Sequence, residues 1–322
     1  MQLLETLSRE DRQVAGKEIL KFNHRLEETG LFTDEALAQL IDEHPRDELT
    51  VCTMRPNPPP HETWIAGDPG KLTGAQLVEA ARKGALWVSP RSAMTKNPRY
   101  KVVFDRLMAE FSKATGVPHL SADAAVLISS PNMGIFFHVD PAETMLWHIR
   151  GHKTIFVYPP HEEHVTEAAL EAILLKETLS DLPYNPLMEN EVSPVKLSPG
   201  EGAYWPLHSP HRVINGQDLN VSISIEFSSP RSVLTNGVFY TNGRLRRRFG
   251  WAPKSRGPAQ AISAPYLLAA KALKTYAPPL MNFERSHERR FDVKLSAPGC
   301  VAWRKDMAPD WAEKPVKRKK AA

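Results

Sequence analysis

The chain has 322 residues, of which 42% are hydrophobic, and its formal net charge is +4. This size and composition predict one large domain with additions, or two domains, with a sizeable buried core. No run approaches the roughly 18 apolar residues of a membrane span. Cys52 and Cys300 lie far apart, so we expect neither a disulfide framework nor a cysteine-based zinc site. The charged first twenty residues lack the apolar segment of a signal peptide, and the chain is expected in the reducing cytoplasm.

The positive charge is concentrated at the end of the chain. The stretch "KPVKRKKAA" at residues 314–322 carries five basic side chains, so the rest of the protein is nearly neutral. Such a tail indicates either a contact with nucleic acid or an anionic surface, or a solvated terminus, and the solvated terminus is favoured.

Residues 1–116 are predicted to form an N-terminal helical region. Thr33 and Asp34 are capping candidates before Leu37, Leu40 and Ile41, which follow helical spacing. The segments 72–86 and 100–116 repeat this amphipathic pattern, and the proline-rich stretch 55–70 predicts a loop between the first two helices.

From residue 117 to residue 232 the pattern changes to short apolar or alternating runs divided by Pro, Gly, Asn and Asp. Many short strands of this kind are typical of a β-sandwich or barrel. One interruption, at about 161–180, has helical spacing and predicts an insertion. Residues 233–322 turn polar and basic and contain a further helical stretch at 261–277, which predicts a C-terminal helical region with a basic tail.

A histidine and a carboxylate stand two residues apart in the apolar run "GIFFHVD". On a strand, His138 and Asp140 project from the same face, roughly 6.5–7 Å apart along the chain. An imidazole and a carboxylate so placed can bind one divalent metal, and a third ligand would complete a 2-His-1-carboxylate face suited to non-haem Fe(II). The alternative is a chance pair without a metal.

The third ligand has to come from a distant strand, and the segment 200–216, "GEGAYWPLHSPHRVING", offers two histidines. His211 begins a run in which it shares a strand face with Val213. His208 lies just before Pro210 and is typical of a turn, so His211 is favoured.

Lys153 is a second unusual residue, because it shares a strand face with the apolar Ile155 and Val157. An ammonium group turned into an apolar barrel is costly unless it meets an anion, and a small dicarboxylate beside the metal would supply one. The alternative places Lys153 at the strand end, with its charge reaching water.

Four motifs together resemble one known family. They are "HVD" at residues 138–140, "GHK" at 151–153, "PP" at 159–160 and "PLHSPHRVIN" at 206–215. The pattern resembles the JmjC and cupin-like Fe(II)- and 2-oxoglutarate-dependent oxygenases, a group related to the asparaginyl hydroxylase of hypoxia-inducible factor. In that group a lysine lies fifteen residues after the first histidine, as Lys153 follows His138. Its distal histidine precedes x-Val-x-Asn, as His211 does here. The resemblance covers about residues 118–230.

The resemblance implies a mainly β fold with flanking helices around a double-stranded β-helix, a jelly roll of the cupin and JmjC type. It implies that His138, Asp140 and His211 hold Fe(II), that Lys153 pairs with the C5 carboxylate of 2-oxoglutarate, and that Thr144 offers a hydrogen bond to it. Members of the family often dimerise through C-terminal helices, so the stretch 261–277 is a candidate homodimer interface, or equally an internal packing element.

Some positions depart from the family pattern. Ile135 stands where many relatives have Thr or Ser, and Thr144 and Glu226 stand where relatives often have Asn. Thr144 can still donate a hydrogen bond and Ile135 cannot. The Glu226 carboxylate would either repel 2-oxoglutarate or recruit a basic substrate group.

Two further groups are candidates for a role in binding. His148 and His152 flank the turn at Arg150 and Gly151 and are expected at the rim of the site. The basic residues within 244–248 indicate either an RNA or acidic-partner contact or a solvated face, and the solvated face is favoured.

Two functions follow from these residues. The first is an Fe(II)/2-oxoglutarate-dependent dioxygenase, a hydroxylase rather than a demethylase, with a protein, a peptide, an RNA base or a small molecule as substrate. The second is a non-catalytic metal-binding cupin that acts as a regulator or binding module, which the departures at Ile135 and Glu226 keep open.

Overall fold

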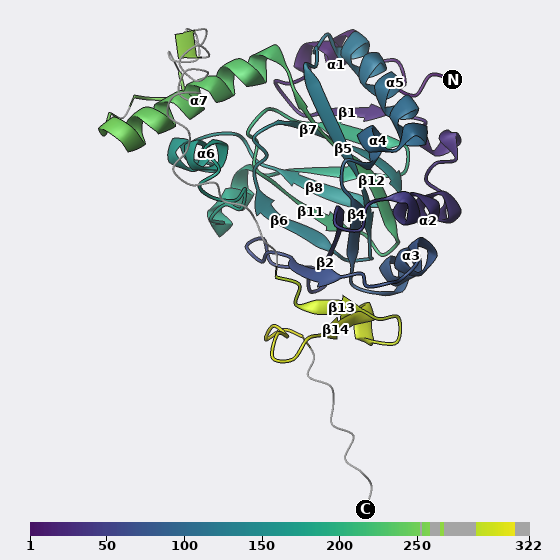
Figure 1. Ribbon diagram of the computed structural model, residues 1–322. Coiled ribbons are helices and arrows are strands. Elements are labelled where there is room, and N and C mark those ends of the chain that lie inside the picture. The colour runs from purple at the N-terminus through teal and green to yellow at the C-terminus, as the bar shows by residue number, and fades with distance from the viewer. Residues whose placement is uncertain (252, 258–264, 267–287, 313–322) are drawn as a thin grey trace, which may run out of the picture.

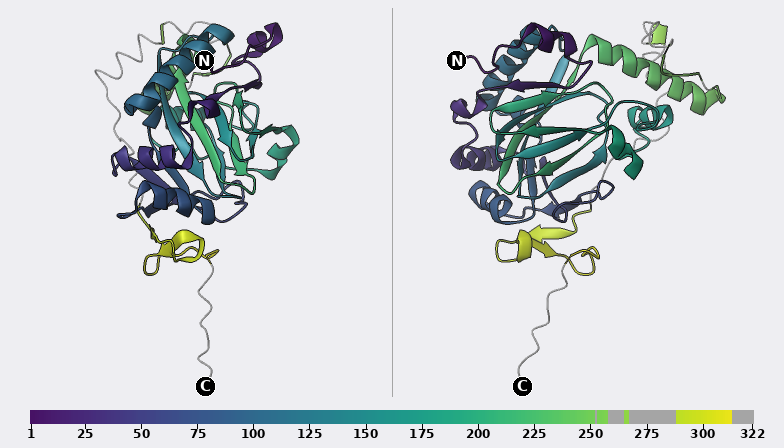
Figure 2. Two further views of the ribbon diagram at one scale, coloured as in Figure 1. Left: turned by 90° about the vertical axis from the view of Figure 1, so that its right-hand side faces the viewer. Right: turned by 180° about the vertical axis from the view of Figure 1, so that it is seen from behind.

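The computed structural model describes residues 1–251, 253–257, 265–266 and 288–312. Two β-sheets lie face to face, and helices cover the outer side of the larger one (Figures 1 and 2). The strands of the barrel are β5 (Ser121–Ser129), β6 (Gly134–His138), β7 (Glu143–Arg150), β8 (Lys153–Val157), β9 (Ser193–Leu197), β10 (Glu201–Tyr204), β11 (His211–Asn215) and β12 (Asn220–Ser228).

These eight strands form a double-stranded β-helix. The larger sheet contains the order β10-β7-β12-β5 and the smaller sheet the order β6-β11-β8-β9, with every neighbouring pair antiparallel. The chain thus crosses from one sheet to the other as it advances, except between β8 and β9, which are neighbours. The predicted jelly roll with flanking helices is confirmed.

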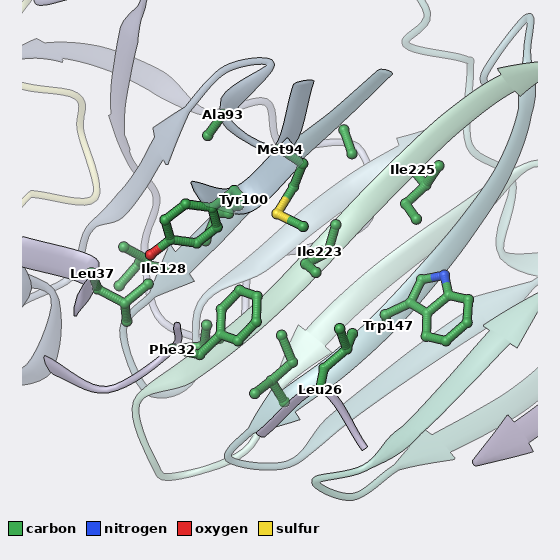
Figure 3. Close-up of a cluster of buried hydrophobic side chains, with 14 of the residues drawn as sticks. Leu26, Phe32, Leu37, Ala93, Met94, Tyr100, Ile128, Trp147, Ile223 and Ile225 are labelled. Carbon is green, nitrogen blue, oxygen red and sulfur yellow. The ribbon is translucent and has the colours of Figure 1, made fainter. Parts of the chain in front are cut away.

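The helical side of the larger sheet holds the main hydrophobic core. Its helices are α1 (Arg9–Val14), α2 (Asp34–Glu43), α3 (Gly74–Lys83), α4 (Ala93–Lys96) and α5 (Pro98–Thr115). Figure 3 shows Trp147, Ile223 and Ile225 of the sheet in one buried cluster with Tyr100 and Met94 of the helices. These residues are all fully buried because alternate positions of β7 and β12 face the helices.

Helix α5 illustrates how the sequence sets the element boundaries. Asn97 accepts a hydrogen bond from the Arg99 amide at the N-terminus, and Pro98 takes the first helical position, where no amide donor is needed. Gly116 ends the helix in the left-handed conformation, with φ of 75°.

The N-terminal region also contains strands that the sequence did not predict. They are β1 (Leu20–Asn23), β2 (Leu49–Thr53), β3 (Ile65–Asp68) and β4 (Trp87–Pro90). β1 joins the larger sheet beside β10, and β4, β2 and β3 extend it beyond β5. The region is still made mainly of helices and loops, as predicted, but these four strands were not foreseen, because runs of four or five residues are too short to show a strand period.

The C-terminal side begins with α7 (Pro230–Phe249), which lies beside α6 (Glu167–Leu174) of the predicted insertion (Figure 1). Later, β13 (Phe291–Val293) pairs with β3 and with β14 (Val301–Trp303), so this part of the region is not wholly helical as predicted. The stretch 261–277 falls outside the described residues except at 265–266, and so does the tail from residue 313. The domain boundaries at 116 and 232 stay predictions.

A buried histidine makes the stability of this fold depend on pH. His24 is 4% exposed, and its ring lies 5.3 Å from that of Trp147. Burial lowers the pKa of His24 to about 4, although the Glu201 carboxylate and backbone hydrogen bonds act in the opposite direction. The unfolded chain therefore binds a proton more readily than the folded one.

We expect the free energy of unfolding to fall as the pH drops from about 6.5 toward 4, with His24 contributing a loss of about 2 kcal/mol at pH 5. The control is His24→Asn. In the wild type the Leu26 amide donates a hydrogen bond to Nδ1 of His24; the asparagine oxygen can accept the same bond but does not titrate. Urea unfolding at pH 7 and pH 5 measures the difference. An equal loss in both proteins would show that His24 is not the cause.

Candidate metal centre

Pairing of β6 with β11 brings the two predicted histidine ligands together. His138 ends β6, His211 begins β11, and the two are direct cross-strand partners with ring centroids 4.2 Å apart. Asp140 approaches both, with Oδ1 3.9 Å from Nε2 of His138 and Oδ2 3.5 Å from Nε2 of His211. Asp140 does not stand on the strand as predicted, because β6 ends at His138 and the next amide, of Val139, donates to the carbonyl of Ser180.

Both imidazoles are oriented by backbone carbonyls. Nδ1 of His138 lies 2.8 Å from the Phe136 oxygen, and Nδ1 of His211 lies 3.2 Å from the Ser209 oxygen. A carbonyl only accepts, so each Nδ1 carries the proton and each Nε2 presents its lone pair toward Asp140. Burial, helped by the neighbouring His138, lowers the pKa of His211 to about 4. The ring is therefore neutral, which is the form that binds a metal.

The donor set fits a divalent transition metal. Within the described ranges, His138, Asp140 and His211 are the one such group found, with ligand atoms all within 4.8 Å of one another. Two atoms bound to one ion at about 2.1 Å lie at most about 4.2 Å apart, so small side-chain rotations close the set. Two imidazoles and one carboxylate leave other positions of an octahedral ion open, as in non-haem Fe(II) sites.

The competing histidine lies outside this cluster. His208 adopts φ of 64°, is 6% exposed, and has Nε2 2.8 Å from Oδ1 of Asn236. The amide of Asn236 donates in turn to the carbonyl of Pro141. His208 therefore supports the loop that carries Asp140, and it also lines a separate pocket of about 300 Å³ together with Arg231 and other residues.

Lys153 lies inside the barrel between the two sheets. It begins β8, is only 5% exposed, and shares its face with the buried Ile155 and Val157. No ion pair to Lys153 is found in the part of the chain that the structure describes, and its Nζ contacts the hydroxyl of Ser222 at 2.9 Å. Burial lowers the pKa of Lys153 to about 7. The alternative of a lysine that reaches water at the strand end is thus wrong.

The three departing positions take up different places. Ile135 packs against the apolar residues of the barrel interior. Thr144 is buried on β7, where its hydroxyl lies 3.4 Å from the carbonyl of Ala142, and it is the cross-strand partner of Glu226. Glu226 is exposed at the surface, but nearby protein atoms replace part of the water around its carboxylate. This desolvation and the negative charge of Asp140 raise the pKa of Glu226 to about 7.

Sequence reasoning missed the groups around the lysine. His148 was expected at the rim, but it is completely buried and contacts Ser222. The strand period explains this: Thr144, Leu146 and His148 alternate with residues that face the helices, so they project into the barrel. The apolar run of β7 could have indicated that His148 is buried. Its contact with Ser222 of β12 could not be predicted, because it depends on the pairing of the two strands. His152 lies at the surface, with 63% of its side chain exposed, and its place at the rim of the site stays a prediction.

Two residues of the arginine cluster form ion pairs within the fold. Arg246 and Arg247 of α7 form ion pairs with Glu171, which is completely buried on α6, and Arg247 also pairs with Glu177. These ion pairs fix two arginines of the cluster against α6, while Arg247 keeps the exposed position expected of a solvated face. None of the described helices is both long and apolar enough to cross a membrane.

Comparisons with known proteins show the fold. No protein-family model and no curated protein matches the chain. The X-ray structure of Escherichia coli YcfD is 15% identical, with 90% of this chain and 76% of YcfD covered at a TM-score of 0.51. A second structure, described as that of the Escherichia coli ribosomal oxygenase YcfD, is 14% identical to this chain. It covers 92% of this chain and 76% of YcfD at a TM-score of 0.49. A third, of YcfD with cobalt and 2-oxoglutarate, is 15% identical, with 92% and 75% covered and a TM-score of 0.48.

Proposed function

We propose that this chain is an Fe(II)- and 2-oxoglutarate-dependent oxygenase of the JmjC and cupin-like type, a hydroxylase of a protein, a peptide or a small molecule. The observation that carries the proposal is a pair of sites in one barrel. Three metal-ligating side chains converge at one place, and a buried lysine with no carboxylate partner among the described residues lies between the same sheets.

The residues at each site fit the groups that the proposal requires. His138, Asp140 and His211 would hold Fe(II) as catalytic residues, since two imidazoles and one carboxylate suit that ion. Lys153 would bind the far carboxylate of 2-oxoglutarate, because a buried ammonium needs a counter-charge. Thr144 would add a hydrogen bond, while Ile135 offers only apolar contact.

When bound, Fe(II), 2-oxoglutarate and O₂ together supply the oxidant for a C–H bond. The chain contributes position and exclusion of water. The carbonyls of Phe136 and Ser209 fix the two imidazoles. Trp205 packs against His211 with ring centroids 4.8 Å apart, and it belongs to the apolar interior of the barrel. This apolar wall shields His211 from bulk water and strengthens the charge contact at Lys153.

We expect the purified protein to convert 2-oxoglutarate to succinate when Fe(II) and ascorbate are supplied. A chelator should abolish succinate formation, and added Fe(II) in excess should restore it, because the metal is held by side chains that remain in place. Succinate is measured by mass spectrometry, with heat-treated protein as the blank. Succinate at the blank level, combined with undetectable 2-oxoglutarate binding, would contradict the oxygenase proposal.

A non-catalytic metal-binding cupin is the second candidate. Glu226 favours it. This residue of β12 lies opposite Thr144 of β7 and interacts electrostatically with Asp140, so its carboxylate would repel a second anion bound near the metal. This candidate predicts tight Mn(II) binding without measurable affinity for 2-oxoglutarate, so one calorimetric titration separates the two functions.

A few residues bear on the compartment and the partners of the proposed enzyme. Cys52 and Cys300 are both buried, which fits a reducing compartment, and we propose the cytoplasm. Nucleic acid is not favoured as a partner, because two arginines of the basic cluster are paired within the fold. A homodimer through residues 261–277 stays a prediction.

A further inference from the structure

The contact of Lys153 links the two sheets. Lys153 belongs to the smaller sheet and Ser222 to the larger one, and Nζ lies 2.9 Å from Oγ across the barrel. The cross-strand neighbours of Lys153 are Asn215 on β11 and Leu197 on β9, both uncharged. Its ammonium group therefore has a neutral hydroxyl as its hydrogen-bond partner among the described residues.

His148 determines which way the Ser222 hydroxyl points. Its Nε2 lies 3.0 Å from the carbonyl oxygen of Gly151, and its Nδ1 lies 2.9 Å from Oγ of Ser222. The carbonyl can only accept, so Nε2 carries the proton and Nδ1 must accept. The Ser222 hydroxyl then donates to His148, and its oxygen lone pairs are left to accept from Lys153.

The charges around this chain of hydrogen bonds keep its direction fixed. Burial and the nearby lysine lower the pKa of His148 to about 3, with small contributions from His24 and His152. Burial lowers the pKa of His24, and His152 is largely exposed to solvent. A neutral His148 accepts through Nδ1 throughout the physiological pH range.

This geometry divides the tasks among the three residues. The proton of Ser222 is committed to His148, so the serine cannot donate to a ligand carboxylate without releasing the lysine. Lys153 donates one N–H to Ser222, and its other two are left for an anion. Of these three residues, Lys153 is therefore the one that can donate to a bound carboxylate, and it does so with a positively charged group.

We propose that His148 and Ser222 are positioning residues that hold Lys153 as a charged anchor, with its remaining N–H groups directed at the bound dicarboxylate. The inference rests on the proposed function, because it takes 2-oxoglutarate as the anion. It goes beyond that function in assigning the direction of each hydrogen bond and the dependence of the lysine on two residues of the opposite sheet.

The test measures binding rather than turnover. Succinate and 2-oxoglutarate are titrated by calorimetry into the Mn(II)-loaded full chain from pH 6 to pH 9. NMR of ¹⁵N-labelled lysine in the metal-free protein follows the titration of Lys153. The wild-type affinity should be highest below about pH 7 and decline above it, as the ammonium in the free protein loses its proton.

Ser222→Ala is expected to lower the affinity about tenfold at pH 7.5, because a hydrogen bond to a charged group is lost. It should also move the decline to lower pH and lower the Lys153 pKa seen by NMR. His148→Leu should act in the same direction, whereas His148→Asn, whose amide oxygen can replace Nδ1 as acceptor, should stay close to wild type. Ser228→Ala, at the other end of β12, is the matched control.

The outcomes separate the two ideas. If Ser222→Ala and His148→Leu bind like Ser228→Ala with an unchanged pH profile, while Lys153→Met loses the ligand, the positioning role is wrong and the oxygenase proposal stands. If Lys153→Met itself binds with wild-type affinity, the anion site of the proposed function is wrong. Should Ser222→Ala not fold, the contrast between His148→Asn and His148→Leu decides.

Discussion

Replacing His138 or Asp140 by alanine is expected to weaken Mn(II) binding at least about 100-fold, more than is usual for residues that only support a ligand. Succinate formation should fall to the blank level in both variants. Each change removes one donor from a set whose atoms lie within 4.8 Å of one another, and an ion held by two ligands exchanges readily with water.

The fold should survive these substitutions, because both side chains are partly exposed, at 14% and 18%, and neither belongs to a hydrophobic cluster. His152→Ala, which removes an exposed imidazole, is the matched control and should bind Mn(II) like the wild type. Metal affinity is measured by calorimetry and by electron paramagnetic resonance of free Mn(II). A His138→Ala protein with wild-type affinity would show that the ion binds elsewhere.

Replacing Lys153 by methionine is expected to have two opposite effects. The affinity for 2-oxoglutarate should fall about 100-fold, since the buried charge that meets its carboxylate is gone. The unliganded protein should become more stable to heat, because an ammonium that lacks an anionic partner is replaced by an apolar chain of similar length.

The control for this variant is Lys196→Met. Lys196 lies on the neighbouring strand β9, opposite Thr154, and is exposed. Its substitution removes one lysine charge from the surface and leaves the buried ammonium group of Lys153 in place. We expect its affinity and melting temperature to match the wild type. A lower melting temperature in Lys153→Met would mean that the lysine stabilises the empty protein, which contradicts the role of an unpaired anchor.

The sequence predicted the barrel well because its strands carry apolar runs on a defined face. It also indicated that His138, Asp140 and His211 converge, since the spacing of each motif resembled one family. Strand register decided the details. His211 meets His138 directly because β6 and β11 pair with these residues opposite each other, and no feature of either segment alone states that register.

The errors have local physical causes. Asp140 leaves the strand because the backbone of Val139 bonds to Ser180 of the insertion, which is a contact between segments far apart in the chain. His148 looked like a rim residue because it stands near a glycine turn, yet β7 continues to Arg150 and buries it. The strands β1 to β4 were missed because short runs gain their stability from the edge of an existing sheet.

A crystal structure of the full chain with Mn(II) and 2-oxoglutarate would test the arrangement most directly. We expect one ion about 2.0–2.2 Å from Nε2 of His138, Nε2 of His211 and a carboxylate oxygen of Asp140. A carboxylate of 2-oxoglutarate should lie within hydrogen-bond distance of Nζ of Lys153, with Ser222 still accepting from that lysine. An ion bound away from these three side chains, or a 2-oxoglutarate molecule that leaves Lys153 without an anion, would contradict the account.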